Sequence, residues 1–339
     1  MAYIKLNKKN FFHNLDIISS HAKDKSKIAI VLKDNAYGHG LKEIASMASE
    51  YGIQKAVVKN TKEAKIIEEY FKYILILADV QNQTYSHTFH IAINDAQDID
   101  VLPPYTNIHI KIDTGMHRNG IDRKELQSTI NKALEKNLKI CGFFTHHKSA
   151  DVLSSEFYWQ NLQFCDIKKE LCEICEKLNL SDIKVHSCNS AAFFRTSNPS
   201  DDLYRIGIAA YGYKMDDFLS NNTNLKPVLS LHAKKLSSRK FKQGQRVGYS
   251  GVYTCTKDTT ISTYDVGYAD GLKRFSDSFC EICNNYKILG RVSMDNISVN
   301  STDDEICIFD DVSNQALFHN TIKYEILTSL NSNIPRYII

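Results

Sequence analysis

Ile28-Ala-Ile-Val-Leu-Lys-Asp-Asn-Ala-Tyr-Gly-His-Gly40 is an apolar run that ends abruptly in a lysine and a glycine-containing turn. The apolar part is typical of a buried strand. Lys33 stands where that strand ends, and a lysine desolvated there loses its proton easily enough to condense with an aldehyde cofactor. The alternative is a lysine at a loop edge whose ammonium group reaches water. Gly38 and Gly40 permit a tight, left-handed strand-to-helix turn, and the Tyr37 hydroxyl is able to bind an anion.

From residue 28 to about residue 215, short apolar runs alternate with longer amphipathic ones, as in parallel strands linked by crossover helices. The pattern predicts strands at 28–32, 55–58, 73–77, 90–93, 108–112, 142–145 and 183–187. It predicts helices at 41–51, 61–71, 123–136 and 156–180. Periodicity alone leaves open a closed eight-stranded barrel and an open doubly wound sheet. Polar residues that follow strand ends resemble the site-building loops of a barrel; they are Lys33, Lys111, Arg118, His146, Asn189 and Ser190.

After about residue 220 the sequence pattern changes to short runs rich in β-branched residues, which are separated by Gly, Asp, Asn and Ser turns. No long helical pattern follows. We therefore predict two domains, residues 1–224 and a mostly β domain at residues 225–339. The boundary falls in the polar segment 220–227, which ends in a proline.

Composition argues against several classes of partner. The formal net charge is +3 and the lysines are scattered, so the electrostatic argument for nucleic acid or a membrane surface is poor. The N-terminus carries charges where a signal peptide needs an apolar segment, and no stretch approaches the length of a membrane span. These observations predict a cytoplasmic protein.

Nine cysteines without a regular spacing predict reduced thiols in such a protein. Two CxxC pairs, Cys172/Cys175 and Cys280/Cys283, leave a zinc site open as an alternative to buried thiols. The first pair lies in a helical run rather than in tight loops, so we expect no metal.

The segment Lys33-Asp-Asn-Ala-Tyr-Gly-His-Gly40 resembles the pyridoxal-phosphate lysine motif of the alanine racemase family, with Asp34 as an unusual residue. The resemblance continues in order along nearly the whole chain, in segments 111–118, 145–146, 189–190, 205–208, 267–271, 290–295 and 324–325. It implies an N-terminal (β/α)8 TIM-like barrel followed by a C-terminal mostly-β domain.

The resemblance implies pyridoxal 5'-phosphate as cofactor and two proton-transferring residues, Lys33 and Tyr268, on opposite faces of the substrate. Arg205 resembles the arginine that faces the cofactor's ring nitrogen; being donor-only, it keeps that nitrogen unprotonated, which favours racemisation. Without the resemblance, Tyr268 reads as a turn aromatic and Arg205 as part of a surface ion pair. The remaining cofactor-binding residues implied are Tyr37, His146, Asn189, Ser190, Gly207, Ile208 and Tyr324.

Substrate binding is implied for Arg118, whose guanidinium suits a carboxylate. Lys111 matches a lysine that many relatives carbamylate into an anion that orients this arginine. Without that modification Lys111 would repel Arg118, or an anion such as chloride would sit between them. The chain reads Gly-Met-His-Arg where the family has Gly-Met-Gly-Arg, and Asn119 replaces a common aliphatic residue.

Met294 and Asp295 resemble a pair that lines the substrate entrance. In relatives this pair and the tyrosine reach the barrel of the other subunit, so the resemblance implies a homodimer with shared sites.

The implied function is the interconversion of L- and D-alanine, which in bacteria supplies D-alanine for peptidoglycan. Three alternatives remain. They are a broad-specificity amino-acid racemase of the same fold, a decarboxylase with the same architecture, and a non-catalytic pyridoxal-phosphate carrier. The decarboxylase leaves Tyr268 poorly explained, and the carrier leaves the β domain unexplained.

Overall fold

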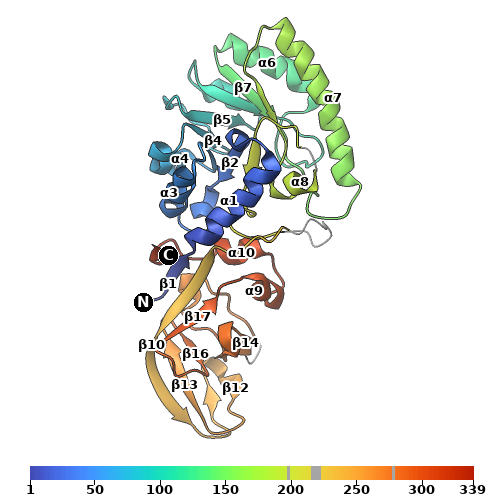
Figure 1. The fold of residues 1–339 in the computed structure, drawn as a ribbon. Coiled ribbons are helices and arrows are strands. Elements are labelled where there is room, and N and C mark those ends of the chain that lie inside the picture. The colour runs from blue at the N-terminus through green and yellow to red at the C-terminus, as the bar shows by residue number, and fades with distance from the viewer. Residues whose placement is uncertain (197–198, 215–222, 277–278) are drawn as a thin grey trace. The chain divides into compact units, whose positions relative to one another are not determined.

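Two compact units make up the chain in the computed structural model, which describes residues 1–196, 199–214, 223–276 and 279–339. The barrel unit comprises Phe12–Asp34 and Ile44–Leu225, and the β unit comprises the remainder: Met1–Phe11, Asn35–Glu43 and Lys226–Ile339. Figure 1 traces the chain from residue 1 to residue 339. The predicted division at 224/225 assigned residues 1–11 to the barrel. Here they lie in the β unit, because their strand pairs there. Residues 220–222 of the predicted linker lie outside the described residues.

Eight parallel strands form the sheet of the barrel unit, in the order β8-β7-β6-β5-β4-β3-β2-β9. Their bounds are β2 Ile28–Val31, β3 Lys55–Val58, β4 Tyr73–Ile76, β5 Phe89–Ile93, β6 Asn107–Lys111, β7 Lys139–Phe144, β8 Lys184–His186 and β9 Tyr204–Ile206. Two backbone hydrogen bonds link each end strand to the segment beside the other. Asp202 N, just before β9, donates to Val185 O of β8 at 3.1 Å, and Arg205 N of β9 donates to Cys188 O, just after β8, at 3.0 Å. The sheet is therefore a nearly closed barrel, which confirms the predicted fold over an open sheet.

The α-helices of the barrel unit lie on the outside of this sheet, as α3, α4, α6 and α7 show in Figure 1. The helices up to the end of the barrel are α1 Lys8–Ala22, α2 Lys33–Tyr37, α3 Leu41–Tyr51, α4 Thr61–Ile67, α5 Asp98–Val101, α6 Leu126–Glu135, α7 Glu156–Lys177 and α8 Ser190–Arg195. The pattern predicted α3 with the same bounds as observed, residues 41–51. It did not predict α1 or the three-residue strand β9, which is too short to show a period.

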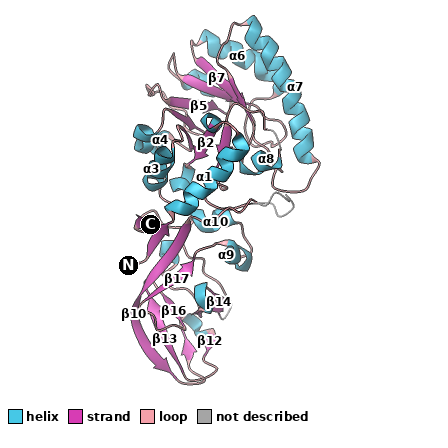
Figure 2. Cartoon of the chain, in the orientation of Figure 1, coloured by secondary structure: helices cyan, strands magenta, loops and turns pink. Residues whose placement is uncertain are grey.

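Strands dominate the β unit, as the colouring in Figure 2 shows. They are β1 Tyr3–Leu6, β10 Leu229–Phe241, β11 Arg246–Val247, β12 Tyr253–Thr254, β13 Thr259–Tyr264, β14 Phe279–Glu281, β15 Lys287–Leu289, β16 Ile297–Val299, β17 Glu305–Phe309 and β18 Arg336–Ile338. The main sheet runs β14-β15-β16-β13-β10-β1-β18, and β17 also pairs with β10. Two short helices, α9 Ser313–Phe318 and α10 Lys323–Thr328, complete the unit. This confirms the predicted mostly-β domain.

Candidate active site

Lys33 lies two residues after the end of β2, at the end of the barrel where all the parallel strands finish. Its amine makes no hydrogen bond or ion pair with any part of the chain that the structure describes. Burial lowers the pKa of Lys33; Asp34 opposes that effect, and the positive charge of Arg118 adds to it. A neutral amine is the nucleophilic form of lysine, so this environment favours covalent chemistry at Lys33.

The backbone after Lys33 is left-handed over four consecutive residues. Asp34, Asn35, Ala36 and Tyr37 have φ between 52° and 55°. Such a conformation costs roughly 1–2 kcal/mol for each non-glycine residue. The Asn35 side chain accepts a bond of 2.8 Å from Leu41 N and so ties the turn to the start of α3. The sequence suggested left-handed backbone only at the two glycines, whereas the strained stretch begins beside Lys33, where strain is typical of functional sites.

Lys111 ends β6 and lies almost entirely buried, with its amine hydrogen-bonded to the side-chain oxygen of Asn119. Burial, then the charges of Arg118 and Arg205, lower the pKa of Lys111 to about 8, against the opposing charge of Asp113. A substantial fraction of this amine is therefore neutral at pH 8. The sequence identified Asn119 as unusual, and the structure shows what its amide binds.

The loop between Lys111 and Arg118 is organised by Asp113. Its Oδ1 accepts hydrogen bonds from the backbone N–H groups of Gly115, Met116 and His117 at 2.9–3.1 Å. His117, where the family has glycine, adopts φ 53°, a left-handed conformation that glycine adopts freely. Its ring Nδ1 lies 3.2 Å from Asp113 Oδ2, which anchors the ring despite the strain. Arg118, beside it, is exposed.

Both His146 and His147 feel the charge of Arg205, but only His146 also feels Arg118 and Lys111. Burial lowers the pKa of His146 well below its ordinary value, and Arg205, Arg118 and Lys111 lower it further. His147 instead packs against Phe157 of α7, with ring centroids 4.9 Å apart. The role of His146 against the cofactor therefore stays a prediction.

Arg205 lies on β9 inside the barrel, almost fully buried. Its Nη2 donates to the carbonyl oxygens of Thr145 at 2.7 Å and Ser187 at 2.9 Å. Its Nη1 donates to His186 Nδ1 at 2.5 Å. Burial lowers the pKa of Arg205 to about 10, which still leaves the guanidinium charged at neutral pH. Arg205 is thus a fixed cation rather than part of a surface ion pair.

Ser190, Asn189, Gly207 and Ile208 come together where β8 and β9 end. Ser190 Oγ accepts a hydrogen bond of 2.9 Å from Gly207 N, and Asn189 Oδ1 caps α8 by accepting from Ala192 N at 2.9 Å. Within the described residues no backbone carbonyl accepts from the N–H group of Ile208. A hydroxyl and loop amides grouped in this way can bind an anion.

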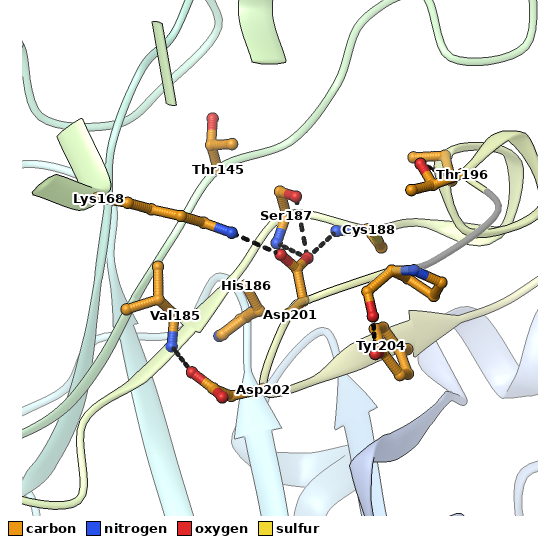
Figure 3. Close-up of polar contacts among 12 residues, drawn as sticks. Thr145, Lys168, Val185, His186, Ser187, Cys188, Thr196, Asp201, Asp202 and Tyr204 are labelled. Carbon is orange, nitrogen blue, oxygen red and sulfur yellow. Dashed lines mark hydrogen bonds and ion pairs between the residues drawn. The ribbon is translucent and has the colours of Figure 1, made fainter. Parts of the chain in front are cut away.

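Asp201 holds this end of the barrel together, a role that the sequence did not indicate. Figure 3 shows its carboxylate receiving bonds from Ser187 and Cys188. The Oδ2 atom accepts from Ser187 N at 2.5 Å, Ser187 Oγ at 2.9 Å and Cys188 N at 2.8 Å, and Lys168 pairs with Oδ1 at 2.9 Å. Burial by itself raises the pKa of Asp201, but Lys168 and these hydrogen bonds outweigh it and hold the pKa below its ordinary value.

We expect Asp201→Asn to lower the free energy of unfolding by about 3 kcal/mol, because it removes the charge of a buried carboxylate that pairs with Lys168 and accepts three hydrogen bonds. A carboxyl with a lowered pKa stabilises the fold above its unfolded pKa near 4, and loses that contribution as the pH falls. The difference between the two proteins is therefore largest above about pH 5 and shrinks below about pH 4. Urea titrations at several pH values measure it. An exposed carboxylate, Asp166→Asn, is the control, and an unchanged difference in acid would contradict the assignment.

In the β unit, Tyr37 and Tyr324 lie together, with ring centroids 5.6 Å apart. Tyr37 is buried and Tyr324 is half-buried. Gly38, next to Tyr37, has φ 80°, and a side chain there would collide with the Leu327 carbonyl oxygen of α10. The close approach at Gly38 therefore fixes Tyr37 beside Tyr324, as a pair of phenols.

Tyr268 begins a 3-10 turn that is fixed to the loop containing Met294 and Asp295. Tyr268 N donates to Ser293 O at 3.0 Å, and Ala269 N donates to Met294 O at 2.9 Å. A side chain at Gly267 would collide with the Met294 carbonyl, so only glycine permits this approach. Tyr268 and Met294 are exposed on the β unit by 42% and 54%, so both remain available to a ligand or a partner.

The described residues contain no group of three or more His, Cys, Asp or Glu side chains arranged to hold a metal ion. The nine cysteines are free thiols. Across the described ranges, no helix is both long enough and apolar enough to cross a membrane.

Comparison with known proteins identifies the family. Residues 6–215 match "Alanine racemase, N-terminal domain" and residues 228–338 match "Alanine racemase, C-terminal domain". An alanine racemase of Nitratiruptor sp. is 47% identical over 336 residues, which cover 99% of each chain. A Bacillus anthracis alanine racemase crystallised "with bound L-Ala-P" superimposes with a TM-score of 0.85 at 25% identity, covering 100% of this chain and 95% of the other. A Bartonella henselae alanine racemase "with covalently bound pyridoxal phosphate" gives 0.80 at 26% identity, covering 100% and 99%. This chain belongs to the alanine racemase family.

Proposed function

We propose that this chain is a cytoplasmic alanine racemase that interconverts L- and D-alanine with pyridoxal 5'-phosphate and supplies D-alanine for peptidoglycan. The observation that supports it most is Lys33, a desolvated amine with a lowered pKa at the carboxyl end of a barrel strand. Bound pyridoxal phosphate makes the Cα hydrogen of an amino acid acidic. The cofactor named for the Bartonella henselae relative is one that the residues at this end of the barrel fit.

Lys33 would hold the cofactor and, once released from it, take or return the Cα proton on one face of the substrate. Tyr268 would serve the other face with its phenol oxygen. Arg205 would present its remaining N–H donors to the ring nitrogen; a guanidinium gives up no proton, so that nitrogen stays unprotonated. His146 would lie against the ring.

The phosphate would be held by neutral donors, since hydroxyls and loop N–H groups form anion-binding sites in proteins. We assign this role to Tyr37, Ser190, Tyr324, Gly207 and Ile208, with Asn189 holding the start of α8 in place. Arg118 would bind the substrate carboxylate.

We further propose a homodimer in which Tyr268, Met294 and Asp295 serve the barrel of the partner subunit. All three side chains belong to one braced, exposed loop pair of the β unit. Met294 and Asp295 would line the entrance for the substrate.

Lys111 is the candidate for carbamylation. Its neutral amine fraction can add carbon dioxide and release a proton, and the resulting anion would lie among Arg118, Arg205 and Lys33, which now depress its pKa. We expect protein equilibrated with ¹³C-bicarbonate to show one carbamate carbon signal by NMR, and Lys111→Ala to remove it. Lys55→Ala is the control, because Lys55 is also a half-buried barrel lysine. No such signal would leave Lys111 as an amine bound to Asn119.

The test is an assay of the purified protein loaded with pyridoxal phosphate and given L-alanine. A D-amino-acid oxidase should detect D-alanine, and the forward and reverse reactions should reach an equal mixture. Comparable rates with larger amino acids would indicate a broad-specificity racemase. Loss of the carboxylate as carbon dioxide would indicate a decarboxylase, and binding of the cofactor without turnover would indicate a carrier.

A further inference from the structure

Polar side chains fill much of the barrel interior, where branched aliphatic residues are usual. His186, His109 and Tyr73 are buried there without a role in the function proposed above. They form a continuous hydrogen-bonded series that begins at Arg205. His186 Nε2 lies 3.1 Å from His109 Nδ1, and His109 Nε2 lies 2.7 Å from the Tyr73 hydroxyl.

The direction of each hydrogen bond follows from the arginine. A guanidinium only donates, so His186 Nδ1, 2.5 Å from Arg205 Nη1, has no proton. Burial lowers the pKa of both histidines well below the ordinary value, so each ring is neutral and has one N–H. His186 therefore has its proton on Nε2 and donates to His109 Nδ1. His109 in turn has its proton on Nε2 and donates to Tyr73.

Gly142 makes this series possible. His109 is on β6 and His186 is on β8, two strands that β7 separates. A side chain at Gly142, in the middle of β7, would collide with the ring of His109. Glycine therefore opens the gap through which the two rings meet.

The ring of Phe144 packs against the end of this series that contains Arg205 and His186. It lies parallel to the His186 ring, at 6° with centroids 5.0 Å apart, and Arg205 Cζ is 5.2 Å from its centroid. The imidazole that Arg205 contacts is thus fixed both in orientation and in tautomer.

We propose that His109 and Tyr73 are positioning residues that act through His186 to hold Arg205 in one orientation. If His186 took the opposite tautomer, its Nδ1–H would face an Arg205 N–H and displace the guanidinium. His109, by accepting a hydrogen bond from His186 Nε2–H, disfavours that tautomer, and the Tyr73 hydroxyl oxygen accepts a hydrogen bond from His109 Nε2–H. The effect of these residues on the reaction rate rests on the proposed function, whereas the tautomers of His186 and His109 follow from the hydrogen bonds alone.

The first test uses the wild-type protein without cofactor, labelled with ¹⁵N-histidine. We expect His186 and His109 to give the nitrogen shifts of neutral rings protonated on Nε2, unchanged between about pH 6 and 8. A proton on His186 Nδ1, or an imidazolium signal from either ring, overturns the proposal even if the protein proves to be a racemase.

The second test compares His109→Leu, His109→Asn and His90→Leu. Leucine removes the acceptor for His186, whereas the asparagine oxygen can replace His109 Nδ1. His90 is the matched control, because its ring lies 5.4 Å from that of His109 and contributes none of these hydrogen bonds. We expect only His109→Leu to shift His186 toward the Nδ1–H tautomer.

In the holoenzyme, His109→Leu should lower kcat about 10²-fold, a loss typical of slight misplacement of an active-site group, with little change in KM. It should also raise the pyruvate formed per racemisation, because a ring nitrogen no longer held unprotonated favours transfer of the amine to the cofactor. His109→Asn should restore much of both. If His109→Leu folds and leaves the His186 tautomer and the pyruvate fraction unchanged, the proposal is wrong. If the protein racemises nothing, the tautomer shift still decides it.

Discussion

Replacing Lys33 with alanine should lower racemisation by at least about 10³-fold, the range expected when a general base is removed, and more if the lysine also holds the cofactor. The visible absorbance of pyridoxal phosphate joined to the protein should disappear. The physical reason is that the described residues offer the Lys33 amine no partner, while burial lowers its pKa. Absorbance spectra and the oxidase-coupled assay measure both effects.

The control is Lys59→Ala, since Lys59 lies near Lys33 but its exposed ammonium only pairs with Asp34 at 3.2 Å. Exposed pairs contribute little, so we expect nearly full activity. Added methylamine should restore part of the activity of Lys33→Ala, because it replaces the missing base without replacing the linkage. Persistence of the visible band in Lys33→Ala would mean that another lysine forms it.

The sequence pattern predicted most strands and the longer helices of the barrel unit because their signals are local, whereas the closure of the sheet was implied by the family resemblance. Strand β2 is an uninterrupted apolar run, and Lys33 is the first polar residue after it. Strand β3 and helix α3 likewise have the bounds that the sequence pattern predicted. Strand β9 was missed since its three residues include the buried Arg205, which interrupts the apolar pattern.

The features that were missed depend on residues distant in the chain. Asp201 reads as an ordinary loop aspartate until Lys168 and the Ser187 amide are seen around it. Gly142 reads as a weakness in a strand, whereas it admits the His109 ring from the next strand. The left-handed turn is local, but four consecutive residues with positive φ contradict the ordinary conformational preferences on which the prediction relied.

Mixing two inactive variants should restore activity if the sites are shared between subunits. Lys33→Ala keeps Tyr268 intact, and Tyr268→Ala keeps Lys33 intact. In a mixed dimer one site receives both substitutions and the other receives neither. Random pairing makes half of the dimers mixed, so we expect about a quarter of wild-type activity from a pool in which each variant alone is nearly inactive.

The controls separate sharing from other causes of recovery. Tyr268→Ala still contains Lys33, so this variant alone should keep the visible absorbance band. Lys33→Ala alone should lack it. A double variant, with both substitutions in one chain, should give no recovery when mixed with either single variant, because no combination then contains an intact pair. No recovery from the two single variants, when subunit exchange is verified by mass spectrometry, would place Lys33 and Tyr268 in the same subunit's site. Tyr268 lies 42% exposed on the β unit, as a base supplied to a partner would have to be before the subunits associate.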